Sequence, residues 1–304
     1  MLGFKQLQLS DKEILDRHLK AVPNRNSDCN FTNLYMWRLS YAVRWAVLED
    51  HLIIEPDAYE GRYILPPYGV DSDDAAFSKA IVHLAKAYKE EEKPFVIRGI
   101  TESERARLKR LFPGRFAYYE EPSIADYIYT GEALRSLKGR KYSKKRGHLN
   151  AFFKDWPDFQ YEEMGADNVE EVIDFLERWY GARNLTDTLD SSLLAERAAI
   201  FDALKAYSTL EYVAGYIRLN GRIMAFTMGE QIAEDTVVIH VEKAFDEIRG
   251  LYQAINQLYL QHQWPDIAFV NREEDMGLEG LRKAKESYYP VTRVYKYTGV
   301  WIDD

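Results

Sequence analysis

A dense group of cations lies near the middle of the sequence, in the stretch GRKYSKKRGHLN at residues 139–150. Residues 131–154 hold eight lysines and arginines against one acid, whereas acids outnumber bases two to one in residues 155–304. A solvated basic helix face is the simplest interpretation, but so local a concentration of charge favours an anion site. Arginine grips phosphate through two nitrogens, and lysine attracts it as a point charge. The predicted phosphate-binding residues here are Arg140, Lys141, Lys144, Arg146 and Asn150.

A second group of reactive side chains lies in HVEKAFDEIRGLYQAIN, residues 240–256. Glu242 and Lys243 end a predicted strand, so their side chains point to opposite faces. Either they belong to an ordinary surface ion pair, or Glu242 faces a substrate at the strand end. The next turn opens a helix, whose free N–H groups and dipole favour an anion. Besides Glu242 as a catalytic candidate, the predicted binding residues are Lys243, Arg249, Gly250, Tyr252 and Asn256.

The third group, NREEDMGLEGLRKAKESYYP at residues 271–290, has the most specific pattern. An acidic start and a basic end complement a helix dipole, by roughly 0.3–1 kcal/mol per charge. That interpretation explains neither the Asn-Arg pair nor the two glycines, which indicate an active-site loop. The predicted catalytic residues are Asn271, Arg272, Glu273 and Asp275, and the predicted binding residues are Arg282, Lys283 and Lys285.

Other kinds of site lack their sequence patterns. The six histidines are scattered, and no two of them lie three or four positions apart beside an acid, so we expect no metal. No GxSxG, Walker or GxGxxG motif is present. Cys29 is the single cysteine, which excludes a disulfide framework. No run of 18 apolar residues and no signal-peptide pattern occurs, so we expect a cytoplasmic protein without a transmembrane segment.

The elements that must position these groups follow one order twice. In the second half, Asn220-Gly221 between two alternating runs is a strong hairpin signal. The predicted elements of this half are helices 169–180 and 191–204, strands 212–219, 222–229 and 236–242, helix 250–263, strand 267–270, helix 279–288 and strand 291–302. The first half repeats the order with helices 11–20 and 31–37, strands 41–48, 51–56 and 62–67, helix 75–89, strand 95–100, helix 102–112 and strand 115–122.

The repeated order predicts an α+β protein made by duplication. Three antiparallel strands followed by helix, strand, helix and strand resemble the core of GNAT acyltransferases. We therefore expect two tandem GNAT-like domains, each with a mostly antiparallel mixed sheet flanked by helices. The expected boundaries are an N-terminal domain at 1–130, a basic connecting helix at 131–155, and a C-terminal domain at 156–304.

Four stretches together resemble the C-terminal domain of phosphatidylglycerol lysyltransferases: KGRKYSKKRGHLNAF, HVEKAF, GLYQAIN and NREEDMGLEGLRKAKESYYP. The similarity covers roughly residues 120–304, with weaker agreement at NFTNLYMW. It implies two tandem GNAT-like domains related to Fem-type peptidyltransferases. Those relatives move an amino acid from aminoacyl-tRNA to a lipid hydroxyl or a peptidoglycan amine, without a metal or a covalent enzyme intermediate. The membrane domain of lysyltransferases and the helical arm of Fem enzymes have no counterpart in this sequence.

We therefore expect a transferase that moves an aminoacyl or acyl group from a phosphate-rich donor to an amine or hydroxyl. Asn271, Arg272 and Lys283 would polarise the ester carbonyl. Glu242, Glu273 or Asp275 would bind the α-ammonium of the donor or take the acceptor's proton. Arg140, Lys141, Lys144 and Arg146 would hold phosphates of tRNA or of another polyanionic donor.

The acceptor would be a small molecule, a peptide or a lipid, which allows peripheral contact with a membrane. No tightly bound cofactor is expected. There are three alternatives. One is an acyl-CoA-dependent N-acetyltransferase, which the single glycine in 247–254 disfavours. The others are a non-catalytic binding protein for an anionic ligand or RNA, and a structural or signalling interaction protein. Pro66 and Pro67 lie at the equivalent place in the first half and remove N–H donors, so the cleft is expected in the second half.

Overall fold

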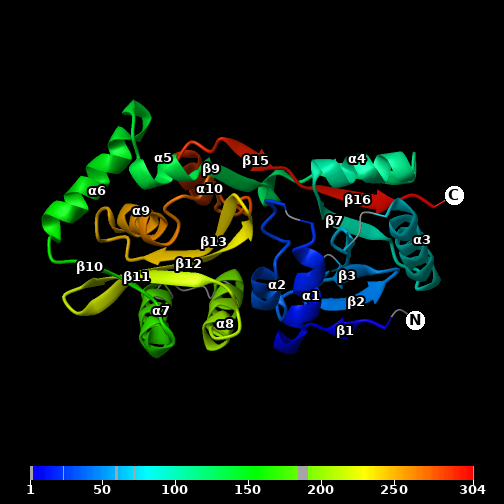
Figure 1. Cartoon of the computed structure of the whole chain (residues 1–304), viewed down its shortest axis with the longest axis horizontal. Coiled ribbons are helices and arrows are strands. Elements are labelled where there is room, and N and C mark those ends of the chain that lie inside the picture. The colour runs from blue at the N-terminus through cyan, green and yellow to red at the C-terminus, as the bar shows by residue number, and fades with distance from the viewer. Residues whose placement is uncertain (1–2, 23, 59–60, 71–72, 184–190, 304) are drawn as a thin grey trace. The chain divides into compact units, whose positions relative to one another are not determined.

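The chain forms two compact units that do not follow a single cut in the sequence. The computed structural model describes residues 3–22, 24–58, 61–70, 73–183 and 191–303. Unit 1 comprises Met1–Asp126, Glu274–Leu278 and Val294–Asp304, and unit 2 comprises Tyr127–Glu273 and Glu279–Arg293. Each unit combines a strand-rich layer with packed helices (Figure 1). Among the described residues, no helix is long and apolar enough to span a membrane.

Unit 1 contains two principal sheets. One has the order β1-β2-β3-β6 and the other the order β7-β16-β8, while β4 and β5 form a small ribbon. The strands are β1 (Lys5–Gln6), β2 (Arg44–Leu48), β3 (His51–Glu55), β4 (Asp57–Ala58), β5 (Gly61–Arg62), β6 (Tyr68–Gly69), β7 (Val96–Ile100), β8 (Phe116–Glu120) and β16 (Tyr297–Trp301). The helices are α1 (Lys12–Leu19), α2 (Phe31–Trp37), α3 (Asp74–Glu90) and α4 (Glu102–Leu111).

Local signals in the sequence explain where these elements begin. The side chain of Asp73 accepts a hydrogen bond from the N–H of Ala75 and caps α3. Thr101 and Glu104 form a capping box at the start of α4. Side chains from α3 and α4 pack on the strands in one apolar core, which includes Phe77, Ile81, Leu84, Leu108, Ile53, Ile64, Ile97 and Ile100.

The third strand expected in the first half, at 62–67, is not formed as one element. Arg62 ends β5, and Ile64 makes an isolated parallel bridge to Ile97. Pro66 and Pro67 follow at once and cannot donate a backbone hydrogen bond, so a continuous ladder is ruled out. The chain re-enters a sheet only at β6.

Unit 2 is built on one seven-stranded sheet with the order β10-β11-β12-β13-β14-β9-β15. Strands from β10 to β13 pair antiparallel, β13 and β14 pair in parallel, and β14 and β9 pair antiparallel. The strands are β9 (Asp126–Thr130), β10 (Gln160–Glu163), β11 (Val213–Leu219), β12 (Arg222–Ala233), β13 (Thr236–Ala244), β14 (Phe269–Asn271) and β15 (Thr292–Val294). The expected hairpin is present, with Asn220 and Gly221 both at positive φ.

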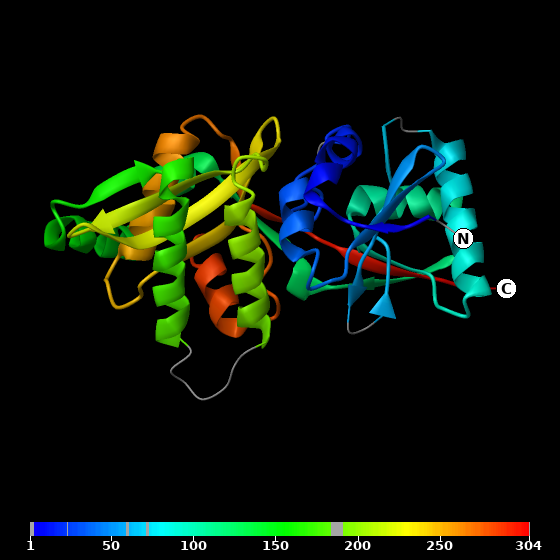
Figure 2. The ribbon, with the colours of Figure 1, turned by 90° about the horizontal axis from the view of Figure 1, so that it is seen from below.

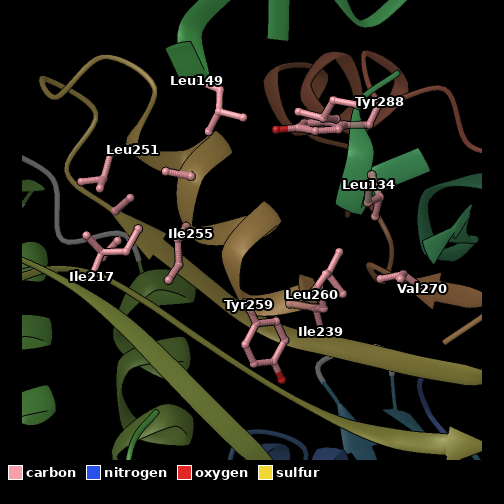
Figure 3. Packing of buried hydrophobic residues seen from close by; sticks show 14 of the residues in the cluster. Leu134, Leu149, Ile217, Ile239, Leu251, Ile255, Tyr259, Leu260, Val270 and Tyr288 are labelled. Atoms are coloured by element: carbon pink, nitrogen blue, oxygen red, sulfur yellow. The ribbon is translucent and has the colours of Figure 1, made fainter. Parts of the chain in front are cut away.

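Helices cover both faces of this sheet. They are α5 (Gly131–Ser136), α6 (Ser143–Asp155), α7 (Val169–Arg183), α8 (Ser191–Lys205), α9 (Leu251–Gln263) and α10 (Glu279–Glu286). α9 packs on β11, β12 and β13, while α7 contacts β12 and β13 from the other face (Figure 1). In Figure 2, α7 and α8 lie side by side. Figure 3 shows Leu251, Ile255 and Tyr259 of α9 packed above the strands that carry Ile217 and Ile239.

The expected connecting helix at 131–155 is two helices, and both belong to unit 2. Leu137 and Gly139 adopt positive φ and interrupt the helix between α5 and α6. Gln257 of α9 donates a hydrogen bond to the carbonyl of Arg135, and α5 and α6 both contact α9. This segment is therefore part of the packed body of unit 2.

Each unit has an internal strand whose neighbours in the sheet are distant in the sequence. β9 lies between β14 and β15, and β16 lies between β7 and β8. The last strand expected at 291–302 is therefore two strands in different sheets, so the C-terminal residues belong to unit 1 and not to the expected domain at 156–304. Just before β16, the buried Lys296 ammonium lies 2.9 Å from Asp126 and 3.0 Å from Asp28.

Candidate active site in unit 2

The candidate site lies at the point where β13 and β14 stop pairing. The two strands pair only over Thr236–Val238 and Phe269–Asn271, and β13 continues to Ala244 without that partner. The register between β12 and β13 shifts so that His240 is an extra residue, which is a β-bulge. Bulges increase the local twist and re-aim side chains, and they are common beside active sites.

Glu242 and Arg272 form an ion pair at this opening. The Arg272 Nη2 donates to Glu242 Oε1 over 2.9 Å, and Asn256 Nδ2 on α9 donates to Oε2 over 2.8 Å. The two charged side chains are only 12% and 14% exposed, so each depends on the other for compensation of its charge. The guanidinium of Arg272 also hydrogen-bonds the hydroxyl of Tyr288.

The ring of Tyr288 lies against two cations. The Lys145 ammonium is 4.1 Å from the ring centre, and the Arg272 guanidinium is 4.9 Å from it. Burial, with repulsion from Arg272 as the next cause, lowers the pKa of Lys145 to about 8. The Gln253 side chain hydrogen-bonds the hydroxyl of Tyr288. Tyr288 therefore connects α6, α9 and the segment after β14.

A pocket of about 270 Å³ opens at the start of α9. Its lining residues are His148, Asp246, Glu247, Ile248, Arg249, Gly250, Tyr252 and Gln253. Gly250 caps the helix with a φ of 86°, and a Cβ there would lie 2.1 Å from the carbonyl oxygen of His148. Only glycine allows this close approach of α6 to the helix start. The pocket adjoins Tyr288 through Gln253.

His240 is enclosed between two carboxylates. Its Nδ1 lies 2.8 Å from Glu273 and its Nε2 lies 3.0 Å from Glu230 on β12, and the side chain is 1% exposed. Burial opposes the charged imidazole, but the hydrogen bonds to both carboxylates outweigh it and raise the pKa of His240 to about 9. Among the described residues, no group of His, Cys, Asp and Glu is arranged to hold a metal ion.

Several predicted residues meet at this site. Glu242, Arg272 and Asn256 are in direct contact, and the Lys285 ammonium binds the carbonyl of Arg272 over 2.5 Å. Arg249, Gly250 and Tyr252 line the pocket. Asn271 is fully buried and accepts a 2.6 Å hydrogen bond from the N–H of Glu273, so it shapes the turn.

Other predicted residues lie elsewhere. Lys243 points to the opposite face, as expected from the strand, and pairs with Glu196 over 2.7 Å. Arg146 donates to the carbonyls of Leu137 and Gly139. Lys283 pairs with the exposed Glu279. The carboxylate of Asp275, in unit 1, accepts from the N–H of Gly277. Arg140, Lys141, Lys144 and Asn150 are exposed, and Arg282 is half-buried.

Sequence reasoning did not identify Lys145, Tyr288, Glu230 or His240 as site residues. Residues two apart on a strand share a face, so the spacing of His240 and Glu242 was a usable signal. Lys145 could not be told apart from the neighbouring lysines, because helical phase alone did not show which of them α9 and Tyr288 would enclose. Glu230 had no signal, since its partner depends on the bulge.

The sequence matches the family described as phosphatidylglycerol lysyltransferase, C-terminal, over residues 19–299. An uncharacterized protein of Mycoplasmoides gallisepticum is 28% identical over 182 residues, which are 58% of this chain and 56% of that protein. The chain thus spans about half the length of this curated relative.

Solved structures give the same picture of the fold. A conserved protein of unknown function from Bacteroides thetaiotaomicron is 34% identical, with a TM-score of 0.91 over 99% of this chain and 100% of that one. L-PGS from Bacillus licheniformis is 14% identical, with a TM-score of 0.67 over 97% and 93%. A tandem GNAT protein from the clavulanic acid pathway is 10% identical and covers both chains fully, with a TM-score of 0.50. The fold is therefore the expected tandem GNAT-like fold, and the chain belongs to the phosphatidylglycerol lysyltransferase C-terminal family.

Proposed function

We propose that this protein transfers an aminoacyl group from a phosphate-rich donor, such as aminoacyl-tRNA, to an amine or hydroxyl acceptor. The family and the tandem GNAT-like fold indicate an acyltransferase-like function. The choice of donor and acceptor is our proposal. We propose that the reaction takes place in unit 2, in the cleft formed by the Glu242–Arg272 pair and the pocket at the start of α9.

The observation that carries the proposal is the enclosed Glu242–Arg272 pair beside the α9 pocket. Arg272 donates one hydrogen bond to Oε1 of Glu242 and Asn256 donates one to Oε2, so the carboxylate keeps a fixed orientation. Each oxygen has a second lone pair, with which it can accept a proton. In the proposed step the acceptor attacks the ester carbonyl and loses its proton to Glu242. The ester C–O bond then breaks, and the departing oxygen takes this proton from Glu242, which restores the carboxylate.

The donor's phosphates would contact the exposed cations of the basic segment. Arg140, Lys141 and Lys144 are solvent-exposed on and just before α6, the helix that also supplies His148 to the pocket. Their charges attract a polyanion from a distance, and neutralised phosphates release counterions. Acceptor and donor would thus approach from the pocket and from the basic surface respectively.

The test is a screen of the full chain with labelled aminoacyl-tRNAs and acyl-CoAs, using amine and hydroxyl acceptors. We expect transfer from an aminoacyl-tRNA and a loss of about 10²–10⁴-fold in Glu242→Gln, as for other general bases. Glu234→Gln is the matched control, because Glu234 is an exposed carboxylate in the turn between β12 and β13. Full transfer by a folded Glu242→Gln variant would show that the reaction does not use this cleft.

A second candidate is acyl transfer from acyl-CoA. The pocket at the start of α9 favours it, because a helix N-terminus accepts phosphate groups. The same screen separates the two, since an acyl-CoA enzyme would label acceptors from the thioester and not from tRNA.

A further inference from the structure

A pocket of about 560 Å³ lies in unit 1, to which the proposed function assigns no role. Its walls come from the β4–β5 ribbon and from the strands β7 and β16, and the residues that line it belong to unit 1. Val96 and Arg98 of β7 line the pocket, whereas Ile97 between them packs in the apolar core on the opposite face. Pockets of roughly 300–1,000 Å³ are typical of sites for small organic ligands.

Arg98 and Glu121 form the central pair of this pocket. Arg98 Nη2 donates to Glu121 over 2.7 Å, and the guanidinium lies 5.1 Å from the centre of the Tyr63 ring. The Thr298 hydroxyl donates to the other oxygen of Glu121, and all four side chains line the pocket. The central pair is 24% and 23% exposed, so it has a fixed orientation and is still open to a ligand.

The central pair has the same chemistry as the Glu242–Arg272 pair of unit 2. The arginines occupy corresponding places in the repeated order of elements and lie in similar sequences, FVIR at 95–98 and FVNR at 269–272. In both units a glutamate accepts from the arginine and from one further donor, and a tyrosine ring lies against the guanidinium. Each unit therefore has an oriented arginine–glutamate pair.

The charges at the pocket indicate the kind of ligand that fits it. The lining cations Arg62, Lys93 and Arg98 each lie beside a glutamate. Lys93 is the most open of them, with a half-exposed side chain and an ammonium 3.8 Å from Glu91. Asp57 also lines the pocket, and its carboxylate makes no hydrogen bond or ion pair among the residues that the structure describes. The pocket therefore offers one accessible ammonium and one unpaired carboxylate.

Bases and acids are equal in number in the ion-pair network around the pocket. The bases are Arg44, Arg62, Lys93 and Arg98, and the acids are Glu55, Asp57, Glu91 and Glu121. An ion of either sign would upset this balance, and a charge that leaves water without compensation is costly. A neutral molecule with one charge of each sign keeps the balance and can pair with both Asp57 and Lys93.

We propose that this pocket binds a small zwitterion, a molecule with one ammonium and one carboxylate group, such as a free amino acid or a short peptide. Asp57 binds the ammonium, and Lys93 binds the carboxylate. Tyr63 and Val96 contact the apolar part of the ligand, and the central pair presents N–H donors and a carboxylate oxygen to its other polar groups. The inference goes beyond the proposed function, because it assigns to unit 1 a ligand of its own.

The first test titrates the full chain by calorimetry with four probes: L-leucine, L-alanyl-L-leucine, N-acetyl-L-leucine and L-leucinamide. The first two are zwitterions, the third lacks the ammonium and the fourth lacks the carboxylate. We expect a zwitterion to bind at least about tenfold more tightly than either blocked compound, because each of these loses one charge-assisted contact. Tighter binding of leucine than of the dipeptide assigns a free amino acid, and the reverse assigns a peptide. Failure of both zwitterions to bind, or equal binding of the blocked compounds, overturns the proposal.

The second test changes the two groups that recognise the ends of the ligand. Asp57→Asn should remove the preference for leucine over N-acetyl-L-leucine, and Lys93→Met should remove the preference over L-leucinamide. Asp50→Asn and Lys86→Met are the matched controls, because both residues are exposed in unit 1, and they should leave the four affinities unchanged. Unchanged preferences in folded Asp57→Asn and Lys93→Met overturn the proposal. None of the probes is an aminoacyl donor, so the result does not depend on whether aminoacyl transfer is found.

A third comparison locates the bound zwitterion. Val96→Phe fills the pocket from β7, whereas Val47→Phe adds the same bulk to an exposed valine of β2. We expect binding at least about tenfold weaker than in the wild-type protein for Val96→Phe alone, because the larger ring takes the space of the ligand. Equal binding by the two folded variants would place the ligand elsewhere and overturn the proposal.

Discussion

His240 shows how one side chain can fix the opening of the sheet. Its Nε2 hydrogen-bonds Glu230 of β12, and its Nδ1 hydrogen-bonds Glu273, which follows Arg272 in the chain. An imidazolium between two carboxylates donates both hydrogen bonds, whereas a neutral ring donates one. The charged form therefore joins two strands to the segment that presents Arg272 to Glu242.

We predict that this contribution to stability depends on pH. The folded pKa of about 9 exceeds the ordinary value of 6.5, so folding favours the protonated ring. The stabilisation is complete below about pH 6.5 and is lost as the pH rises through 9, and it amounts to at most about 3 kcal/mol. His240→Gln should therefore lower the free energy of unfolding strongly at pH 6 and weakly at pH 10, as measured by urea denaturation.

His83→Gln is the control, because His83 is exposed on α3. An equal loss in His240→Gln at pH 6 and pH 10 would show that the ring acts through packing and not through its charge.

The residues of the site differ in how far the sequence reveals them. The meeting of Glu242 and Arg272 could be predicted because polar groups near the ends of neighbouring strands come together where the strands part. The partners of His240 are 10 and 33 residues away, and the bulge that turns the ring toward them leaves no mark on the alternation of residue types. Lys145 could not be predicted as a site residue, because its position is defined by packing against Tyr288, which is 143 positions further along the chain.

At the scale of elements, the basic segment contains two kinds of cation. Arg146 binds the carbonyls of Leu137 and Gly139 and so closes the interrupted turn between α5 and α6. Lys141 and Lys144 are exposed. We predict that Arg146→Ala lowers the free energy of unfolding by about 1–3 kcal/mol, since hydrogen bonds to a charged group are lost.

The double variant Lys141→Ala with Lys144→Ala should keep its stability within about 0.5 kcal/mol. It should bind tRNA more weakly, with a salt slope smaller by about two, because two phosphate contacts are lost. Filter binding across a salt series measures this. Unchanged slope and affinity would show that these lysines are only a solvated face.

The start of α9 depends on one glycine. Gly250→Ala would force a Cβ to within 2.1 Å of the His148 carbonyl oxygen at a φ of 86°, and we expect a loss of about 2–4 kcal/mol. Gly147→Ala on α6 is the matched control, because nothing lies within 4 Å of its added Cβ. It should stabilise the protein by about 0.5–1 kcal/mol through helix propensity. Equal melting temperatures for the two variants would contradict this account.

Elements with local signals could be predicted, and elements defined by distant partners could not. The Asn220-Gly221 hairpin follows from two residues that tolerate positive φ. The residues at 62–67 have the apolar character of a strand, but Ile64 finds a partner only at Ile97, and the two prolines end the run.

For the whole molecule, the sequence shows that the order of elements repeats, but it does not show which strands become neighbours in a sheet. Apart from the strands expected at 62–67 and 291–302, each half contains the expected kinds of element in the expected order, which is why the tandem fold could be inferred. A strand's alternation indicates which face is buried and does not identify its neighbour in the sheet. Nothing local therefore distinguishes β15 from β16, although they enter different sheets.

We predict that removal of residues 296–304 unfolds unit 1. The deletion takes away β16, which pairs with both β7 and β8, and also the buried Lys296, whose ammonium pairs with Asp126 and Asp28. Hydrogen exchange should show at least about 100-fold loss of amide protection in β7 and β8. Removal of residues 303–304 alone is the control, because the ion pair of Asp303 with Lys89 is solvent-exposed and such pairs contribute little to stability. Native protection in the longer deletion would contradict this assignment of β16.

The placement of β16 also bears on how the protein is made in the cell. β7 leaves the ribosome about 200 residues before β16, a delay of roughly 10–40 s at ordinary elongation rates. During that time the facing edges of β7 and β8 have no partner, and open strand edges recruit other chains. Unit 2 also waits for its last strand, β15, which ends only two residues before β16 begins, so neither unit is complete until residues 292–301 have been made. Newly made chains should accordingly depend on chaperones for longer than the length of either unit implies, and stop codons that remove β16 should cause aggregation rather than a mild loss of stability.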